Sequence, residues 1–419
     1  MIVLGFAPVA AQAQEGRPVT RTASPYEVQA SVEYWTPERM AAARPMPLPM
    51  VVDPQLPRPE VLLPPDARPG FAPGWDPRSG LAPPHPLTRY ELNEEQWKNF
   101  TNFPGYLGFV IEPMAFGSPP ANPVDYPNYG KFARWTWYGN YLVYPTSTIG
   151  KLFFTIPGVG DGACTATVIG RSTIVTAGHC VSSLINGTPT WHTNFLFCPS
   201  YYRAGGSGGP HPARGCWSWV RVVTTFQWHY FKNLDLDYAC IVTHTTGTVV
   251  ADKVGNVTGW VGRTWNWPPV QSILAWGYPG EPPFPGYHII TVAANEWYSV
   301  NTSDEGESVV NLVSKYIGSD MTGGSSGGPW WLGTRHPNPA FNYADTDGVL
   351  YTGWVGGPFL NGVNSHRRCF NYSCARPPSA SGGVFWQEMG SPPFTSSSTD
   401  YNDSEDVFGN CLSHSNNNP

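Results

Sequence analysis

From about residue 148 onward, short apolar runs alternate with turn-forming residues, and this alternation restricts the fold more than any other feature. Nine runs are rich in β-branched and aromatic residues: KLFFTI, CTATVI, STIVTA, NFLFC, WVRVVTTF, DYACIVTH, QSILAWGY, VVNLVSKYI and GVLYTGWV. Gly, Pro, Asn and Asp separate them, and no long stretch has the 3.6-residue period of a helix. We therefore predict an all-β sandwich or barrel.

Proline divides the chain into two unequal parts. Of the 45 prolines, 24 fall within residues 1–127. The stretch RPMPLPMVVDPQLPRPEVLLPPDARPGFAPGWDP cannot form a helix or a central strand, because each proline lacks a backbone donor and has a fixed φ. We predict an extended and largely unpacked segment here.

Charge and cysteine content exclude several function classes. The net charge is −6 and only 13% of residues are charged, so no basic surface favours nucleic acid. No apolar stretch is long enough to cross a bilayer, so we expect no membrane partner. The eight cysteines lack C-x-x-C spacing and no histidine pair has ligand spacing. We predict disulfides, no metal and no cofactor.

The first residues resemble an export signal. The apolar stretch IVLGFAPVA precedes Ala11-Gln12-Ala13, a small-x-small cleavage pattern, although a positive n-region is missing. We predict a signal peptide over residues 1–13; the alternative is a disordered apolar tail. Disulfides and export together predict a secreted, extracellular protein.

Three short stretches supply the residue types of nucleophilic catalysis. STIVTAGHC ends in His179 and Cys180, NLDLDYACIVTH contains Asp237, and GGSSGGP contains Ser326. A serine hydroxyl becomes nucleophilic when an imidazole takes its proton, and a carboxylate must orient that imidazole. His179, Asp237 and Ser326 occur in this order, 58 and 89 residues apart.

Each of these residues has a nearby competitor. Ser207 lies in a second Gly-Gly-Ser-Gly-Gly-Pro string, but it precedes Asp237 and would give another chain order. Ser325 is interpreted as a turn residue. Asp235 would share a face with Asp237 in an extended segment, and we interpret it as an exposed turn residue.

The motifs resemble those of the chymotrypsin-like serine peptidases, which read T-A-x-H-C, D-x-A-x-I and G-x-S-G-G-P. The resemblance covers about residues 145–390, and GYPG at 277–280 with TGGSSGG at 322–328 is closer to the secreted bacterial glutamyl-endopeptidase branch. It implies two six-stranded antiparallel β-barrels with the cleft between them. It also implies Ser326 as nucleophile, His179 as base and Asp237 as the orienting carboxylate.

The resemblance extends to the groups around the nucleophile. The backbone N–H groups of Gly324 and Ser326 would form the oxyanion hole, and Gly324 would permit the turn that makes them converge. GVNSH resembles the substrate-binding strand, which would place Ser365, His366 and Arg367 beside the peptide backbone. For His366 the alternative is a partly exposed strand residue without a role.

Residue preference stays open between three alternatives. In the resembled family, the residue six before the nucleophile lies at the base of the specificity pocket, and here it is Asp320. A carboxylate there would pair with Arg or Lys of the substrate. Glutamate specificity would require a histidine where Asn364 stands, and Met321 is not the small hydroxyl residue expected for it. Broad or apolar preference is the third alternative, with Asp320 only accepting backbone N–H bonds.

Four disulfides are expected. The resemblance implies Cys164–Cys180, the bridge that holds the loop of the catalytic histidine. Proximity in sequence suggests Cys198–Cys216 and Cys369–Cys374. Cys240–Cys411 is left by elimination, with a free buried thiol at Cys240 as its alternative.

Together these predictions give a domain plan. Residues 1–13 would be the signal peptide, 14–140 a Pro-rich pro-segment and 141–419 a trypsin-like serine peptidase domain that acts as a monomer on proteins or peptides.

The family's usual activation switch needs an aspartate before the nucleophile, but Ser325 is uncharged. A pro-segment would therefore act by steric cover or assisted folding; the alternative is a linker without an inhibitory role. The main alternative for the whole protein is a catalytically silent binding protein of the same fold, and a G-x-S-x-G esterase is disfavoured because Pro329 follows the serine loop.

Overall fold

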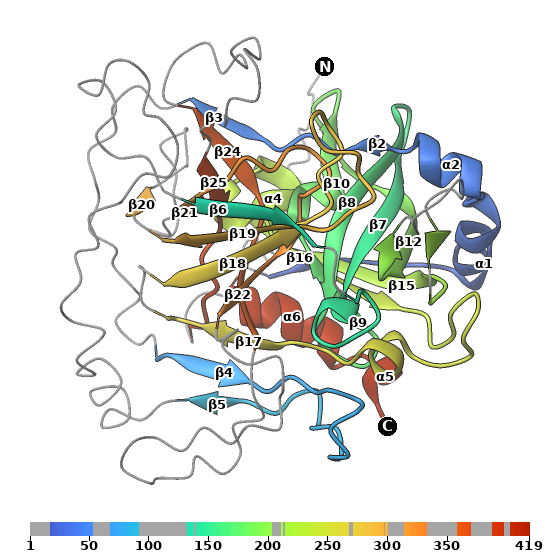
Figure 1. The fold of residues 1–419 in the computed structure, drawn as a ribbon. Helices are drawn as coiled ribbons and strands as arrows, with labels where there is room; N and C mark the ends of the chain where they lie inside the picture. The colour runs from blue at the N-terminus through green and yellow to red at the C-terminus, as the bar shows by residue number, and fades with distance from the viewer. Residues whose placement is uncertain are drawn as a thin grey trace, which may run out of the picture.

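The computed structural model describes residues 17–52, 68–91, 132–137, 140–202, 211–212, 214–267, 271–296, 298–300, 314–332, 358–369, 388–397 and 403–419. Strands dominate these residues and the helices are short (Figure 1), which confirms the predicted all-β fold. Ser207 and Cys374 lie outside the described residues, as do residues 1–13 of the predicted signal peptide.

Six antiparallel strands close into a barrel in the first half of the molecule. Their order is β15-β12-β7-β8-β9-β16, and β16 pairs with β15 to complete the ring. The strands are β7 (Ile149–Ile156), β8 (Gly160–Val168), β9 (Thr173–Thr176), β12 (Thr193–Pro199), β15 (Trp217–Thr224) and β16 (Ala239–Thr243). Each buries apolar side chains in the interior, so the predicted β-runs become the barrel wall.

The second half contains two further sheets. The larger has the order β5-β4-β17-β23-β22-β18-β19-β6, and the smaller β20-β21-β25-β24-β3. Between the described residues no pairing closes these sheets into the predicted second barrel. Their strands are β3 (Met50–Val52), β4 (Gly70–Ala72), β5 (Tyr90–Glu91), β6 (Phe132–Thr136), β17 (Gly262–Trp265), β18 (Ser272–Gly277), β19 (Ile290–Asn295), β20 (Tyr298–Val300), β21 (Ser314–Gly318), β22 (Pro329–Leu332), β23 (Phe359–Val363), β24 (His366–Cys369) and β25 (Glu388–Ser391).

The described part of the Pro-rich region is packed, which corrects the prediction of a largely unpacked segment. β1 (Val19–Thr22) pairs with β15, and β2 (Arg44–Pro45) pairs with β8. Between them, α1 (Pro25–Tyr34) and α2 (Pro37–Ala42) lie against the barrel, where Trp35 is 5% exposed. Within its described residues, β2, β3 and β4 are extended, because the prolines of this region disfavour a helix.

The remaining elements are short. They are β10 (Ser182–Ile185), β11 (Thr188–Trp191), β13 (Tyr201–Tyr202), β14 (His211–Pro212), α4 (Phe226–Phe231), α5 (Val254–Thr258), α6 (Ser404–Leu412) and the 3₁₀ turns η1 (Thr146–Thr148), η2 (Gly178–Cys180), η3 (Leu234–Leu236) and η4 (Ser415–Asn417). Within the described ranges, no helix combines the length and apolar character that crossing a bilayer requires.

Three of the predicted disulfides are confirmed: Cys164–Cys180, Cys198–Cys216 and Cys240–Cys411. The last excludes a free thiol at Cys240 and ties α6 to β16. Cys369–Cys374 stays a prediction, since Cys374 lies outside the described residues.

Candidate active site

His179 lies in η2, directly after β9, and its position is fixed from both sides. Cys180 is bonded to Cys164 of β8, so the histidine loop is anchored to the barrel wall. A Cβ at Gly178 would lie 2.6 Å from Trp228 and 2.9 Å from the Asp237 carboxylate. Glycine at this position therefore allows the histidine loop to approach both side chains closely.

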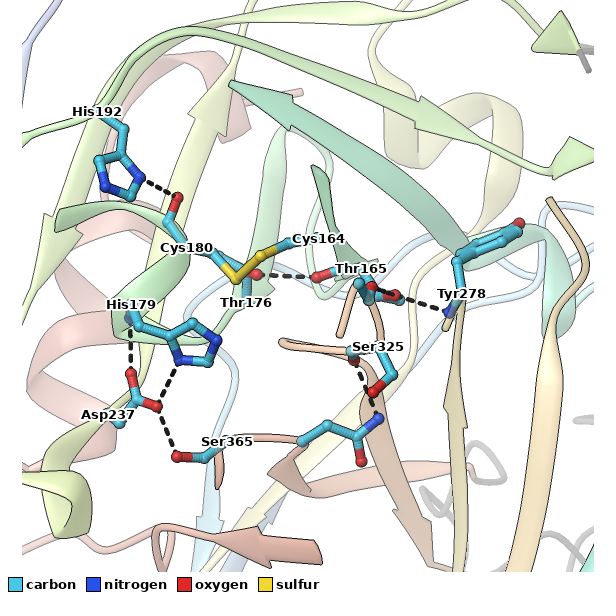
Figure 2. Close-up of a disulfide and its surroundings, with 12 residues drawn as sticks. Cys164, Thr165, Thr176, His179, Cys180, His192, Asp237, Tyr278, Ser325 and Ser365 are labelled. Atoms are coloured by element: carbon cyan, nitrogen blue, oxygen red, sulfur yellow. Dashed lines mark hydrogen bonds and ion pairs between the residues drawn. A yellow bond between two sulfur atoms is a disulfide. The ribbon is translucent and has the colours of Figure 1, made fainter. Parts of the chain in front are cut away.

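Asp237 holds the backbone and the ring of His179 at once. Its Oδ1 accepts a hydrogen bond from the His179 backbone N–H at 2.7 Å, and its Oδ2 lies 2.8 Å from His179 Nδ1. Ser365 Oγ donates to the same Oδ2 at 2.5 Å. Figure 2 shows His179, Asp237 and Ser365 joined in this way. An ionised carboxylate only accepts, so it selects the tautomer that carries the proton on Nδ1 and leaves Nε2 as the acceptor.

The loop that carries Ser326 docks against the same part of the barrel. The Ser326 carbonyl accepts a hydrogen bond of 2.7 Å from the Thr165 N–H. Gly324 and Gly327 have φ of +89° and +77°. A Cβ at Gly327 would lie 2.0 Å from Thr176 Oγ1, so the loop can reach β9 only with glycine there.

Ser326 and His179 are both buried, at 0% and 3% exposure. Among the described residues, neither Ser326 Oγ nor His179 Nε2 has a hydrogen-bond partner. The structure therefore brings His179 and Asp237 into contact and docks the serine loop on the adjacent strands, without a hydrogen bond between serine and histidine.

His366 is part of a buried hydrogen-bonded row and is not the partly exposed residue of the alternative interpretation. Its Nδ1 lies 2.9 Å from Ser365 Oγ, and its Nε2 lies 2.8 Å from the hydroxyl of Tyr316 in β21. Burial lowers the pKa of His366 to about 3. Its imidazole is consequently neutral at physiological pH and connects Tyr316 to the Ser365–Asp237 pair.

Two competitors of the predicted residues are located by the structure. Asp235 is buried rather than exposed, and its Oδ1 accepts hydrogen bonds from the backbone N–H and the hydroxyl of Ser314. The prediction of an exposed turn residue is wrong because β21 covers this carboxylate. Ser325 donates its hydroxyl to the Thr322 carbonyl at 2.7 Å, as a turn residue would.

Two residues of the predicted substrate-binding set contact other parts of the protein. The Asp320 carboxylate forms an ion pair with Arg134 of β6. The buried Asn364 amide donates to the carbonyls of Trp276 and Ser325 and accepts from the Trp330 indole. Asn364 thus fixes the serine loop on the sheet.

One group of metal-type side chains gathers within the described part of the chain: Cys164, His179 and Cys180. Both sulfurs belong to the Cys164–Cys180 disulfide, so neither offers a thiolate to an ion.

Sequence motifs did not reveal three neighbours of the site. Trp228 of α4 packs edge-on against His179 with 6.1 Å between ring centres, Tyr316 contacts His366, and Arg134 contacts Asp320. The aromatic run FQWHYF, which begins eleven residues before Asp237, was the available indication for Trp228. Tyr316 and Arg134 reach the site only through sheet pairing, so no local pattern marks them.

Similar solved structures are serine proteases. The protease Anisep from Arthrobacter nicotinovorans is 25% identical, with 62% of this chain and 93% of that chain covered and a TM-score of 0.42. A thermostable serine protease, AL20, from an extremophilic microorganism is 28% identical, covering 59% and 91%, with a TM-score of 0.40. A Glu endopeptidase in complex with MPD is 17% identical, covering 68% and 98%, with a TM-score of 0.40.

No family model matches the chain, and no curated protein matches it.

Proposed function

We propose that the protein is a secreted serine endopeptidase that hydrolyses peptide bonds through an acyl-enzyme. The arrangement of His179 and Asp237 carries this proposal. A buried carboxylate binds both the backbone N–H and Nδ1 of one histidine, which leaves Nε2 free to accept a proton. A binding protein has no need of a buried histidine oriented in this way.

In the proposed reaction, Ser326 Oγ attacks the peptide carbonyl carbon while its proton passes to His179 Nε2. The tetrahedral intermediate collapses, the C–N bond breaks, and His179 gives the proton to the leaving amine. Water then attacks the acyl carbon while its proton passes to His179 Nε2. The ester bond breaks, His179 gives the proton to Ser326 Oγ, and the acid is released. Asp237 holds the imidazole in its tautomer and stabilises the imidazolium.

The backbone N–H groups of Gly324 and Ser326 are proposed as the oxyanion hole. The φ of +89° at Gly324 favours glycine at this turn. Removal of one such donor typically costs about 3–4 kcal/mol in the transition state.

Proteins or peptides are the proposed substrates of a monomer, with residues 14–140 as a pro-segment. The three disulfides fit an oxidising, extracellular location.

The test is covalent labelling with a fluorophosphonate, followed by peptide mapping of the secreted form. We expect label on Ser326 alone, and Ser326→Ala should lower turnover of casein by about 10⁴- to 10⁶-fold. Label on Ser207, or full activity of the Ser326→Ala variant, would overturn the assignment. A folded protein that neither labels nor cleaves would favour the silent binding protein, and hydrolysis of a nitrophenyl ester without casein cleavage would favour an esterase.

A further inference from the structure

One segment of the Pro-rich region runs from the barrel to β24 and contacts the serine loop at Gly324. We name residues 44–52 the strap. In Figure 1 this blue segment runs from α2 through β2 to β3, beside β24. Ser326 is 0% exposed and His179 3% exposed, so a substrate carbonyl reaches the serine hydroxyl only if a covering segment moves.

The strap begins as an added strand on the barrel. Arg44 and Pro45 of β2 run parallel to Gly162 and Ala163 of β8. The Met46 N–H then donates to the Ala163 carbonyl at 2.9 Å. Ala163 directly precedes Cys164, so this end of the strap is anchored beside the disulfide that holds the histidine loop.

The centre of the strap occupies a donor that catalysis would need. The Gly324 N–H donates to the Met46 carbonyl at 2.9 Å. This N–H is one of the two proposed oxyanion donors. A peptide carbonyl already accepts from it, so a substrate carbonyl and the strap compete for the same hydrogen bond.

The far end of the strap covers the predicted substrate-binding strand. The Arg367 N–H donates to the Pro49 carbonyl at 2.7 Å, and β3 pairs in parallel with β24. Between these bonds, Leu48 is 3% exposed and belongs to the same buried apolar cluster as Met321, the neighbour of Asp320. The strap therefore combines backbone pairing with one apolar anchor, as peptides bound by strand addition do.

The strap sequence explains this mode of binding. Pro45, Pro47 and Pro49 have no N–H, so the strap contacts Gly324 and Arg367 through its carbonyls. Proline also restricts the free chain to extended conformations, which lowers the entropy lost on binding. A Pro-rich strand is consequently well suited to occupy this cleft.

We propose that the cleft is a binding site for a Pro-rich peptide strand, and that residues 44–52 occupy it as a built-in inhibitor that blocks substrate until displaced. This inference rests on the proposed serine peptidase function. It predicts that Ser326 reacts slowly in the full chain and rapidly once the strap is loosened.

The test compares full chains with different strap anchors. Leu48→Asp places a charge in the apolar cluster. Leu48→Ala weakens the same anchor less, because it shortens the apolar side chain without adding a charge. Leu81→Asp is the matched control, because Leu81 lies in the same N-terminal region and is 53% exposed.

The readout is the rate of fluorophosphonate labelling of Ser326, with circular dichroism as the check on folding. We expect labelling about 10- to 100-fold faster in Leu48→Asp, the factor for loss of one buried leucine contact. The increase should be smaller in Leu48→Ala and absent in Leu81→Asp.

A synthetic peptide that covers residues 43–52 provides the second measurement. It should slow labelling of the Leu48→Asp chain, whereas the same peptide carrying Leu48→Asp should not. If Leu48→Asp does not fold, Leu48→Ala and peptide competition against it decide the question. Wild type that labels as fast as the Leu48 variants would overturn the strap and leave the serine chemistry intact. Absence of label from every folded chain would instead overturn the proposed function, and the strap proposal with it.

Discussion

At Asp237, the hydrogen-bond directions follow from one restriction. The carboxylate only accepts, so the single Ser365 hydroxyl proton goes to Asp237, and Ser365 Oγ must accept from His366 Nδ1–H. His366 Nε2 is then an acceptor, and the Tyr316 hydroxyl donates to it. Because burial keeps the pKa of His366 at about 3, the ring stays neutral and this order persists in ordinary buffers.

Tyr316 is therefore expected to act on catalysis as a positioning residue. Tyr316→Phe should lower kcat about 2- to 10-fold, the usual effect of losing one neutral hydrogen bond, and leave KM unchanged. Tyr230→Phe is the control, since Tyr230 is 42% exposed. Steady-state kinetics on a peptide substrate give both constants. An increase in KM at constant kcat would contradict a positioning role.

Asp320 gives a second prediction at this scale. Its carboxylate is paired with Arg134, which leaves less of its charge for a basic substrate side chain. Arg134→Gln should raise cleavage after Lys and Arg, relative to other residues, by about 10- to 100-fold, because one charge-assisted contact becomes available. Peptide-library profiling measures this, and Asp320→Asn added to Arg134→Gln should abolish the increase. Unchanged profiles in both variants would make Asp320 a turn residue outside the pocket.

Elements differ in how far the sequence predicts them. KLFFTI, CTATVI and STIVTA coincide with β7, β8 and β9, because a buried barrel strand needs a run of β-branched and apolar residues. GVLYTGWV lies outside the described residues. α1 was not predicted, although Ser24 and Glu27 form a capping box that the sequence displays.

Other features could not be read from local patterns. Packing of the Pro-rich region depends on edges of β8, β15 and β24 that are distant in sequence. For the same reason, His179 and Asp237 could be identified from motifs, whereas the burial of Asp235 and His366 could not. The contact that buries each of these two residues comes from β21, a separate part of the chain.

The disulfides allow a prediction at the scale of elements. Cys240–Cys411 closes a loop with a sequence separation of 171 residues, and Cys198–Cys216 one of 18. In the chain-entropy model these loops correspond to about 5 and about 3 kcal/mol of stabilisation. Replacing Cys240 and Cys411 by Ala should therefore lower the urea midpoint more than replacing Cys198 and Cys216. Equal midpoints would show that the unfolded chain is already restricted near α6 and β16.

At the scale of the whole molecule, buried titratable groups couple stability to pH. Burial lowers the pKa of His192 and His366 to about 3, and that of His229 to about 4. Asp403, the N-cap of α6, shows the opposite effect: burial and the nearby Asp406 raise its pKa to about 8. Between pH 5 and 6.5 the unfolded chain binds protons at the histidines that the native state does not bind, while the native state retains one at Asp403.

The sign of the pH dependence follows from this difference in bound protons. Near pH 5, His192 and His366 add almost two protons to the unfolded state and Asp403 adds one to the native state, so the unfolded state binds about one more (two minus one), and His229 adds to the excess. Towards pH 6.5 the unfolded histidines are only about half protonated, so the excess becomes smaller but keeps its sign. Averaged over pH 5 to 6.5, the free energy of unfolding should rise by at least about 1 kcal/mol per pH unit, most steeply near pH 5. Urea unfolding of the Ser326→Ala chain, which avoids self-digestion, measures the slope. Asp403→Asn keeps a good N-cap and removes the opposing proton, so the slope should steepen by about 1.4 kcal/mol per pH unit. A flat profile, or an unchanged slope in Asp403→Asn, would mean that these side chains are protonated alike in the native and unfolded states.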